Sequence, residues 1–357
     1  MKRRIGILTA GGDCPGLNAA IRGVARAAYE TFDAEIIGIL DGYRGLIEGE
    51  FRLMRKQDFS GILTLGGTIL GSSRRPFREM RLLGDDNVDK VAAMKKTYED
   101  LKLDCLVTLG GNGTHKTANL LSEEGLHVIG LPKTIDNDIY GTDFTFGFHT
   151  ACEIATDVID RLHTTAASHG RVIVVEIMGN KAGWLTLYSG MAGGADAILL
   201  PEIPYDIEKV AEVMESRARN NKAFSIIAVA EGAMDKKEAK LKRKEREAAR
   251  KDAGFHGIAY RIAEQLQELA GVEARAVVPG HIQRGGTPCA YDRVLSTQFG
   301  VHAADLIKKD KYGYTVALVG NEIVHNKLSD VAGISKLVPE DHQMVDLARN
   351  IGISFGD

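Results

Sequence analysis

Residues 131–143, LPKTIDNDIYGTD, bring three carboxylates into a short stretch, because Asp136, Asp138 and Asp143 fall within eight residues. An apolar run at 126–130 precedes them and predicts a strand whose carboxyl end delivers these acids into a crevice. So dense a polar cluster at a strand end indicates a catalytic loop. The other side chains that could take part belong to Lys133, Thr134 and Thr142.

Two glycine-rich loops add a second kind of chemistry. AGGDCPG at 10–16 lies between an apolar strand at 4–9 and a helical pattern that starts at Leu17, and GGNGT at 110–114 repeats this order. Glycines let backbone N–H groups approach an anion, and the helix N-terminus adds favourable partial charge. The pattern favours a phosphate cradle, although a tight β–α turn would look the same.

Arginines indicate two further places for an anion. Arg74 and Arg75 follow glycines and hydroxyl residues at 65–73, and a guanidinium can bind an oxyanion through two hydrogen bonds. His281 and Arg284 lie among the glycines of PGHIQRGG. The alternatives are a solvated basic turn for the first pair and a structural histidine for the second.

The elements that must position these residues alternate between strand and helix. Nearly all-apolar strands are predicted at 4–9, 35–40, 105–109 and 126–130, as expected in a parallel sheet covered on both faces. The alternation starts again after residue 143, with strands at 171–177, 225–230 and 274–278. At 357 residues the chain exceeds what one hydrophobic core usually serves, so two α/β lobes are expected, with a single large α/β unit as the alternative.

Composition limits the classes of binding partner and the cellular compartment that we expect. A formal charge of −3 gives no electrostatic reason to expect nucleic acid or an anionic membrane. Four widely spaced cysteines, with no signal peptide and no apolar run long enough to span a bilayer, predict a reduced, cytoplasmic protein. The run 235–252 carries nine basic and five acidic residues, which is more typical of a solvated helix or mobile excursion than of a partner-binding arm. We assign it no chemistry.

From residue 4 to about residue 295 the chain resembles the 6-phosphofructokinase family. Seven motifs in the family's order make this signal specific, and the chain is most similar to bacterial members and to a longer-chain branch that uses ATP. The motifs are GGDCPGLNAAIRG (11–23), GGTILGSSR (66–74), GGNGT (110–114), PKTIDND (132–138), SHGRVIVVEIMG (168–179), AEG (230–232) and GHIQRGG (280–286).

The resemblance implies an α/β fold with two Rossmann-like lobes, mainly parallel sheets and an active site in the cleft between the lobes. Residues 1–147 with about 284–335 would form the lobe for ATP and Mg²⁺. Residues 148–283 with about 336–357 would form the sugar-phosphate lobe, with the charged run as an excursion. The implied reaction phosphorylates fructose 6-phosphate at its 1-hydroxyl to give fructose 1,6-bisphosphate and ADP.

Phosphoryl transfer needs positioning, charge neutralisation and an acceptor for one hydroxyl proton. By resemblance, Asp136 is that base, and Asp138 is the carboxylate that holds Mg²⁺ with Asn112 beside it. The groups that would orient the transferring phosphoryl and balance its charge belong to Thr134, Gly12 and Arg74.

The resemblance also assigns the two substrate sides. Because family members take the arginines that match Arg171 and Arg275 from a neighbouring subunit, we expect a homodimer or homotetramer with shared active sites. The nucleotide-side positions are Gly12, Tyr43, Arg74, Arg75, Gly110, Asn112, Gly113, Thr114 and Lys133. The sugar-phosphate positions are Arg171, Met178, Gly179, Glu231, Arg275, His281 and Arg284.

Two positions disagree about the phosphoryl donor. Gly113 resembles ATP-using members, whereas pyrophosphate-using members carry an aspartate that would occupy adenylate space and repel the α-phosphate. Lys133 is typical of pyrophosphate-using members and of the longer ATP-using branch, and a lysine there excludes nothing by itself. ATP is therefore the expected donor, with a pyrophosphate-dependent phosphotransferase as the alternative.

Asn112 and Asn180 depart from bacterial ATP-using members, which usually place an acid and an arginine there. Weaker metal binding is one expectation, and a regulatory subunit that lost catalysis is the alternative from outside enzymology. A different kinase, related only through GGNGT, would leave Arg171 and the motif at 280–286 unexplained.

Overall fold

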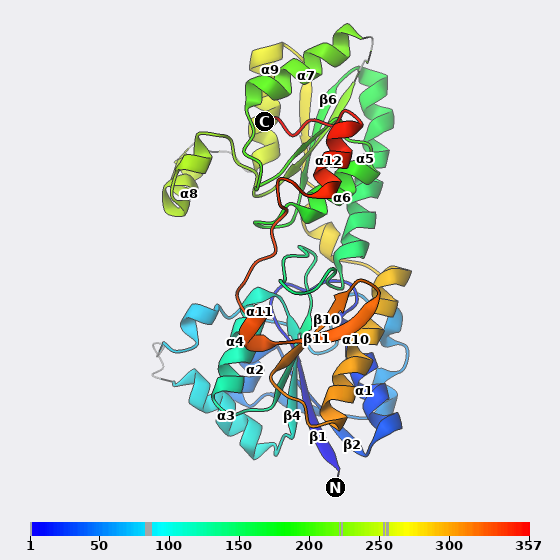
Figure 1. The fold of residues 1–357 in the computed structure, drawn as a ribbon, viewed down its shortest axis with the longest axis vertical. Helices are drawn as coiled ribbons and strands as arrows, with labels where there is room; N and C mark the ends of the chain where they lie inside the picture. Colours follow the sequence, from blue (N-terminus) through cyan, green and yellow to red (C-terminus); the bar gives the residue numbers. More distant parts are fainter. Residues whose placement is uncertain (1, 83–87, 221, 223, 253, 255–256) are drawn as a thin grey trace. The chain divides into compact units, whose positions relative to one another are not determined.

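The computed structural model describes residues 2–82, 88–220, 222, 224–252, 254 and 257–357. Two compact units divide the chain. The first consists of Met1–Thr150 with Arg284–Lys336, and the second of Ala151–Gln283 with Leu337–Asp357. Figure 1 shows the N-terminal colours and the orange segment in one unit, and the green and yellow segments with the red C-terminus in the other.

The first unit is built on a sheet with the strand order β11-β10-β5-β4-β1-β2-β3. The inner strands β10, β5, β4, β1 and β2 run parallel to one another. The edge strands β11 and β3 pair antiparallel with β10 and β2. Because β1, β4 and β5 run parallel side by side, the loops that follow them leave the sheet at the same edge. The bounds are β1 Arg3–Thr9, β2 Ala34–Ile39, β3 Phe51–Met54, β4 Cys105–Gly110, β5 Val128–Pro132, β10 Tyr314–Val319 and β11 Glu322–Lys327.

Helices pack on this sheet, and the close contact of α1 with α10 joins the later segment, Arg284–Lys336, to the rest of the first unit. A Cβ at Gly23 of α1 would lie 2.9 Å from the Thr297 carbonyl oxygen of α10, and one at Gly300 would lie 2.6 Å from that of Ala20. Only glycine allows this backbone approach. The bounds are α1 Leu17–Thr31, α2 Tyr43–Glu48, η1 Lys56–Phe59, η2 Ile62–Thr64, η3 Phe77–Glu79, α3 Lys90–Asp100, α4 Asn112–Glu123, α10 Ala290–Lys308 and α11 Leu328–Val331.

The second unit holds a parallel sheet with the order β7-β8-β6-β9. Its strands β6 and β8 are almost wholly buried, as their apolar sequences predict. The strands are β6 Val172–Ile177, β7 Ala197–Leu199, β8 Ser225–Ala230 and β9 Ala274–Val277. The helices are α5 Phe148–His169, α6 Trp184–Ala192, α7 Ile207–Arg219, η4 Glu238–Lys240, α8 Arg243–Asp252, α9 Ile258–Ala270, η5 Gly280–Arg284 and α12 Gln343–Asn350.

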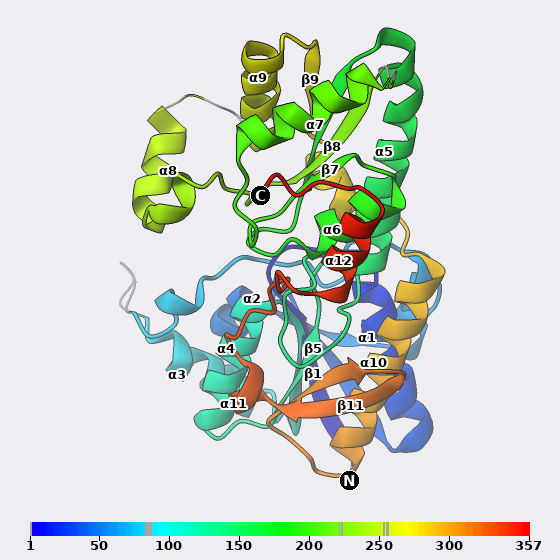
Figure 2. The same cartoon turned by 45° about the horizontal axis from the view of Figure 1, so that its top comes forward.

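The charged run 235–252 folds into η4 and α8. Figures 1 and 2 show α8 standing off from the sheet of the second unit, which fits the polar helix predicted there. The run is not solvated throughout, however, because its residue Glu238 is only 6% exposed. No local pattern predicts this burial, because the two arginines that neutralise Glu238 are 12 and 23 residues away along the chain.

The predicted α/β class with mainly parallel sheets is confirmed. Among the helices of the described ranges, none combines the length and the apolar character that crossing a membrane requires.

Candidate active site

The glycine loop after β1 is held by the segment that carries Arg74. Gly11 has a φ of +86°, a left-handed value that favours glycine, and its N–H donates to the Ser73 carbonyl at 3.1 Å. The Ser72 hydroxyl donates back to the Gly11 carbonyl at 2.6 Å. These bonds fix the predicted phosphate cradle beside the arginine.

Three cationic side chains converge on Gly12. A Cβ at this position would lie 2.7 Å from Arg284 Nη1 and 3.3 Å from Arg74 Nη2. The Lys133 ammonium donates to the Gly12 carbonyl. Such a group of cations suits an anionic phosphate. Arg284, which we expected on the sugar-phosphate side, lies in the first unit and donates to the Asp13 carbonyl at 3.3 Å.

Lys133 links the glycine loop to the acid loop. Its side chain is almost fully buried, and this burial lowers the pKa of its ammonium. Its backbone N–H donates to the Gly110 carbonyl at the end of β4, at 3.1 Å. Lys133 therefore contacts the loop after β1 and the last residue of β4, and the loop after β5 continues directly from it.

The next arginine along the chain, Arg75, has a different partner. Its guanidinium lies 3.7 Å from the Glu48 carboxylate at the C-terminal end of α2. Both side chains are partly exposed, and such pairs contribute at most about 1 kcal/mol. A more highly charged ligand could therefore displace Glu48 at small cost.

Local hydrogen bonds build the acid loop. Thr134 Oγ1 accepts from the Asp136 N–H at 3.0 Å. Asn137 has a φ of +50°, and its side chain accepts from the Thr145 N–H at 3.0 Å and donates to the Asp143 carbonyl at 3.1 Å. Asn137 is a positioning residue that the sequence analysis missed. Its tolerance of the left-handed region, between two aspartates, was the available signal.

Asp138 and Asn112 meet where α4 begins. Asn112 Nδ2 donates to the Asp138 carbonyl at 3.0 Å and to the Asp138 carboxylate at 3.2 Å. Burial raises the pKa of Asp138, although the hydrogen bond from Asn112 opposes this shift. Asn112 Oδ1 is buried and accepts no hydrogen bond from any described residue. A carboxylate beside an unsatisfied amide oxygen suits a hard cation such as Mg²⁺.

The turn that opens α4 is supported from within the protein. The Tyr43 hydroxyl donates to the Thr114 carbonyl at 3.0 Å, and the tyrosine is only 2% exposed. A Cβ at Gly110 would lie 2.1 Å from Thr114 Oγ1, so only glycine fits there. Tyr43, expected against the nucleotide, thus contacts the turn itself. Gly113 is exposed, and a Cβ there would meet nothing within 4 Å.

In the second unit, a carboxylate organises the end of the sheet. Glu231 follows β8, and its Oε1 accepts from the Gly179 N–H at 3.1 Å and the Asn180 N–H at 2.6 Å. Gly179 has a φ of +144° and Asn180 a φ of +54°, so this turn after β6 depends on residues that tolerate positive φ. Asn180 therefore acts here through its backbone.

The fully buried Gln283 joins the same end of the sheet to η5, and the sequence analysis missed it. Its Oε1 accepts from the Met178 N–H at 3.2 Å, and its Nε2 donates to the Gly280 carbonyl at 3.1 Å. This amide positions η5, and His281, which also belongs to η5, is exposed. A single glutamine in this glycine-containing loop forms no sequence pattern that reveals such a contact.

Arg171 and Arg275 lie at the other end of this sheet. Both guanidinium groups contact Glu273 Oε1, at 2.8 Å and 2.7 Å. Arg171 precedes β6 whereas Met178 follows it, and a strand of six residues is roughly 20 Å long. Within one protomer, the predicted sugar-phosphate residues of the second unit therefore form two separate groups, while Arg284 lies in the first unit.

The fold and this geometry define an α/β protein in which a glycine loop and a carboxylate loop follow two parallel strands, β1 and β5, on either side of β4. A sequence profile of the phosphofructokinase family matches residues 4–307. The chain belongs to the phosphofructokinase family, which confirms the resemblance of its motifs.

Named relatives and solved structures refine this placement. An ATP-dependent 6-phosphofructokinase of Spirochaeta thermophila is 55% identical over 99% of this chain and 98% of its own. A pyrophosphate–fructose 6-phosphate 1-phosphotransferase of Amycolatopsis methanolica is 47% identical over 95% of this chain and 97% of its own. The T-state structure of Pichia pastoris phosphofructokinase has a TM-score of 0.81 at 32% identity, covering 93% of this chain and 35% of that chain.

Proposed function

We propose that this protein is an ATP-dependent 6-phosphofructokinase, which transfers the terminal phosphoryl group of ATP to the 1-hydroxyl of fructose 6-phosphate. The observation that carries the proposal is the convergence of Arg74, Arg284 and Lys133 on Gly12, with the acid loop continuing from Lys133. The reaction needs both parts, because the transferred group carries charge on three oxygens and one hydroxyl must lose a proton.

The acid loop would supply the base and a positioning hydroxyl. Asp136 would take the proton from the 1-hydroxyl as that oxygen attacks phosphorus. Thr134 Oγ1 already accepts the Asp136 N–H, which leaves its own O–H free to donate to the transferring group. Arg74 and the Gly12 N–H would stabilise the charge that develops on the phosphoryl and leaving oxygens.

Asp138 and Asn112 would hold Mg²⁺ through oxygen. The described residues include no cluster of three or more His, Cys, Asp or Glu side chains that could hold a metal, so the protein offers part of a coordination shell. This fits Mg²⁺, which usually keeps several waters and binds through one or two carboxylates and substrate phosphates. When bound, the ion would neutralise charge on the donor phosphates.

Gly113 supports ATP as the donor. Overall identity also favours ATP, because the ATP-dependent relative is 55% identical to this chain and the pyrophosphate-dependent one is 47% identical. The open space at Gly113 could admit a nucleotide where an aspartate would be repelled by its α-phosphate. Pyrophosphate is the second candidate, and the position of Lys133 at Gly12 favours it, since an ammonium can pair with any donor phosphate.

The separation of the sugar-phosphate residues supports shared active sites. Met178, Gly179 and Glu231 lie at one end of the second sheet, and Arg171 and Arg275 lie at the other. We propose that the two arginines act on the sugar phosphate of a neighbouring subunit in a homodimer or homotetramer. The proposal also includes a cytoplasmic location, which the four free cysteines support.

Steady-state turnover tests the reaction and the donor together. The purified protein is assayed with fructose 6-phosphate and Mg²⁺, with either ATP or pyrophosphate as donor. We expect fructose 1,6-bisphosphate to form faster with ATP. Faster turnover with pyrophosphate would reverse the donor assignment, and no product with either donor would overturn the proposed reaction.

A further inference from the structure

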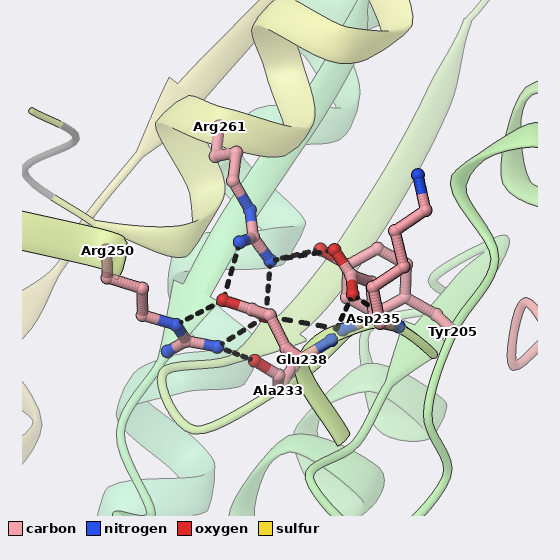
Figure 3. A network of polar contacts seen from close by, with 7 residues as sticks. Tyr205, Ala233, Asp235, Glu238, Arg250 and Arg261 are labelled. Carbon is pink, nitrogen blue, oxygen red and sulfur yellow. Dashed lines mark hydrogen bonds and ion pairs between the residues drawn. The ribbon is translucent and has the colours of Figure 1, made fainter. Parts of the chain in front are cut away.

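A buried carboxylate anchors the charged run to the second unit. Burying an ionised carboxylate is costly unless it is paired and hydrogen-bonded. Figure 3 shows how Glu238 meets this requirement, with Arg250 of α8 approaching on one side and Arg261 of α9 on the other. Such a site requires that α8 be docked at this place, so the run is not a free arm.

Both arginines bind Glu238 through two hydrogen bonds. Arg250 donates at 2.8 and 2.9 Å, and Arg261 donates at 2.7 and 2.8 Å. Arg261 also donates to the Tyr205 hydroxyl at 2.7 Å. Burial alone would raise the pKa of Glu238, but these bonds outweigh it and lower the pKa to about 2. The carboxylate is therefore charged at physiological pH and holds both arginines in place.

The same Arg250 reaches the turn that carries Glu231. Its Nη2 donates to the Ala233 carbonyl at 2.5 Å, as drawn in Figure 3. The Ala233 N–H donates to the Ala230 carbonyl at 2.9 Å, which closes a tight turn with Glu231 inside it. On the other side, a Cβ at Gly232 would lie 2.1 Å from the Asn180 carbonyl oxygen. The turn is thus confined between that backbone and Arg250.

We infer that Arg250 is a positioning residue for Glu231, so that the charged run clamps the turn that binds the acceptor sugar. This inference rests on the proposed function, in which Glu231 binds fructose 6-phosphate. Arg250 itself contacts no substrate in this scheme. It acts through the Ala233 carbonyl, and Glu238 orients it.

The variant Arg250→Met tests the clamp without leaving a buried charge unpaired, because Glu238 keeps both hydrogen bonds from Arg261. Arg217→Met is the matched control. Arg217 has 28% side-chain exposure against 29% for Arg250, and it pairs with Asp196 at 2.8 Å. It also donates to Ser225 Oγ at 3.0 Å, at the opposite end of β8 from Glu231.

We expect Arg250→Met to raise KM for fructose 6-phosphate about tenfold, the factor that corresponds to one lost charge-assisted hydrogen bond, with KM for the donor unchanged. Arg217→Met should leave both KM values near wild type. An unchanged KM in Arg250→Met, or an equal rise in both variants, contradicts the clamp. If Arg250→Met is not recovered, Arg250→Lys is the deciding variant. Its KM should rise about threefold, because one ammonium cannot reproduce the geometry of the three guanidinium hydrogen bonds.

Hydrogen exchange provides a readout that does not depend on turnover. The amides of Glu231 and Ala233 should exchange faster in Arg250→Met than in wild type or in Arg217→Met, because the turn has lost its outer contact. Equal exchange rates in all three proteins would overturn the inference even if fructose 6-phosphate is a substrate. If exchange is faster in Arg250→Met but the wild-type protein does not turn over fructose 6-phosphate, the clamp stands and the proposed function is refuted.

Discussion

The backbone N–H of Lys336 donates to the Asp138 carbonyl at 2.8 Å. The ammonium of the same residue donates to the Thr142 and Asp143 carbonyls at the far end of the acid loop, both at 2.8 Å. One residue close to the C-terminus thus holds both ends of the segment that carries the proposed metal carboxylate. Its backbone bond does not depend on the side chain, and any residue except proline can make it, so the two ends can be tested separately.

Lys336→Met should weaken the use of Mg²⁺. The variant keeps the aliphatic part of the side chain but loses two hydrogen bonds, so we expect the Mg²⁺ concentration for half-maximal turnover to rise about tenfold. Lys90→Met is the control, because Lys90 also donates to two backbone carbonyls, at 3.2 and 2.7 Å, away from the site. A Mg²⁺ titration that is identical in both variants would argue against a role for Lys336.

Asp136→Asn should abolish most of the chemistry while preserving binding. The amide has nearly the same shape but cannot accept the proton, and a positioned base contributes about 10²–10⁴-fold to such reactions. We therefore expect kcat to fall by at least about 10²-fold, with the affinity for fructose 6-phosphate, measured by calorimetry, largely retained. Near-normal turnover would show that another group is the base.

Gly113→Asp should select against the nucleotide. The position is exposed and a Cβ there meets nothing within 4 Å, so the variant should fold normally. We expect KM for ATP to rise about tenfold or more, through repulsion of the α-phosphate, with any pyrophosphate-dependent activity spared. Gly113→Asn separates charge from bulk. If both variants bind ATP as wild type does, the nucleotide does not pass this position.

Glu238 should make stability depend on pH under acidic conditions. Its pKa falls from the usual 4.5 to about 2 in the folded protein, and its side chain is 8% exposed. As the pH drops from about 4.5 to about 2, the unfolded state takes up the proton first, so this contribution is lost on acidification. The shift corresponds to on the order of 3 kcal/mol.

The measurement for this prediction is the difference in unfolding free energy between wild type and Glu238→Gln. The difference should be largest above about pH 5 and should shrink as the pH approaches 2, because glutamine cannot titrate. A difference that stays constant over this range would mean that the two arginines do not hold the carboxylate charged.

Mixing two inactive variants tests the shared active site. Asp136→Asn removes the base and Arg171→Met removes an arginine that we propose acts on a neighbouring subunit. If the base and the arginine of one site come from different protomers, oligomers formed from both variants contain some sites with neither substitution. Part of the activity then returns after the two variants are unfolded and refolded together. No recovery from well-folded mixed oligomers would place both groups in one protomer.

Local patterns were enough for much of this protein. The apolar strands, the glycine loops after β1 and β4, and the polar cluster after β5 were all visible in short stretches. Their meeting at one edge follows from parallel pairing, which the apolar character of the strands already predicts. That is why Gly12, Lys133 and the acid loop could be assigned to one site before the fold was known.

The contacts that hold these groups in place were not visible in the same way. Arg284 reaches Gly12 from 272 residues further along the chain, Lys336 reaches Asp138 from 198 residues further, and Glu238 is paired by arginines from two different helices. No local pattern encodes such pairings. The amino-acid sequence by itself determined which residues can do the chemistry, because side-chain type and strand periodicity are local properties. Only the tertiary structure decided which cation faces which carboxylate or carbonyl, because that depends on how the chain folds back on itself.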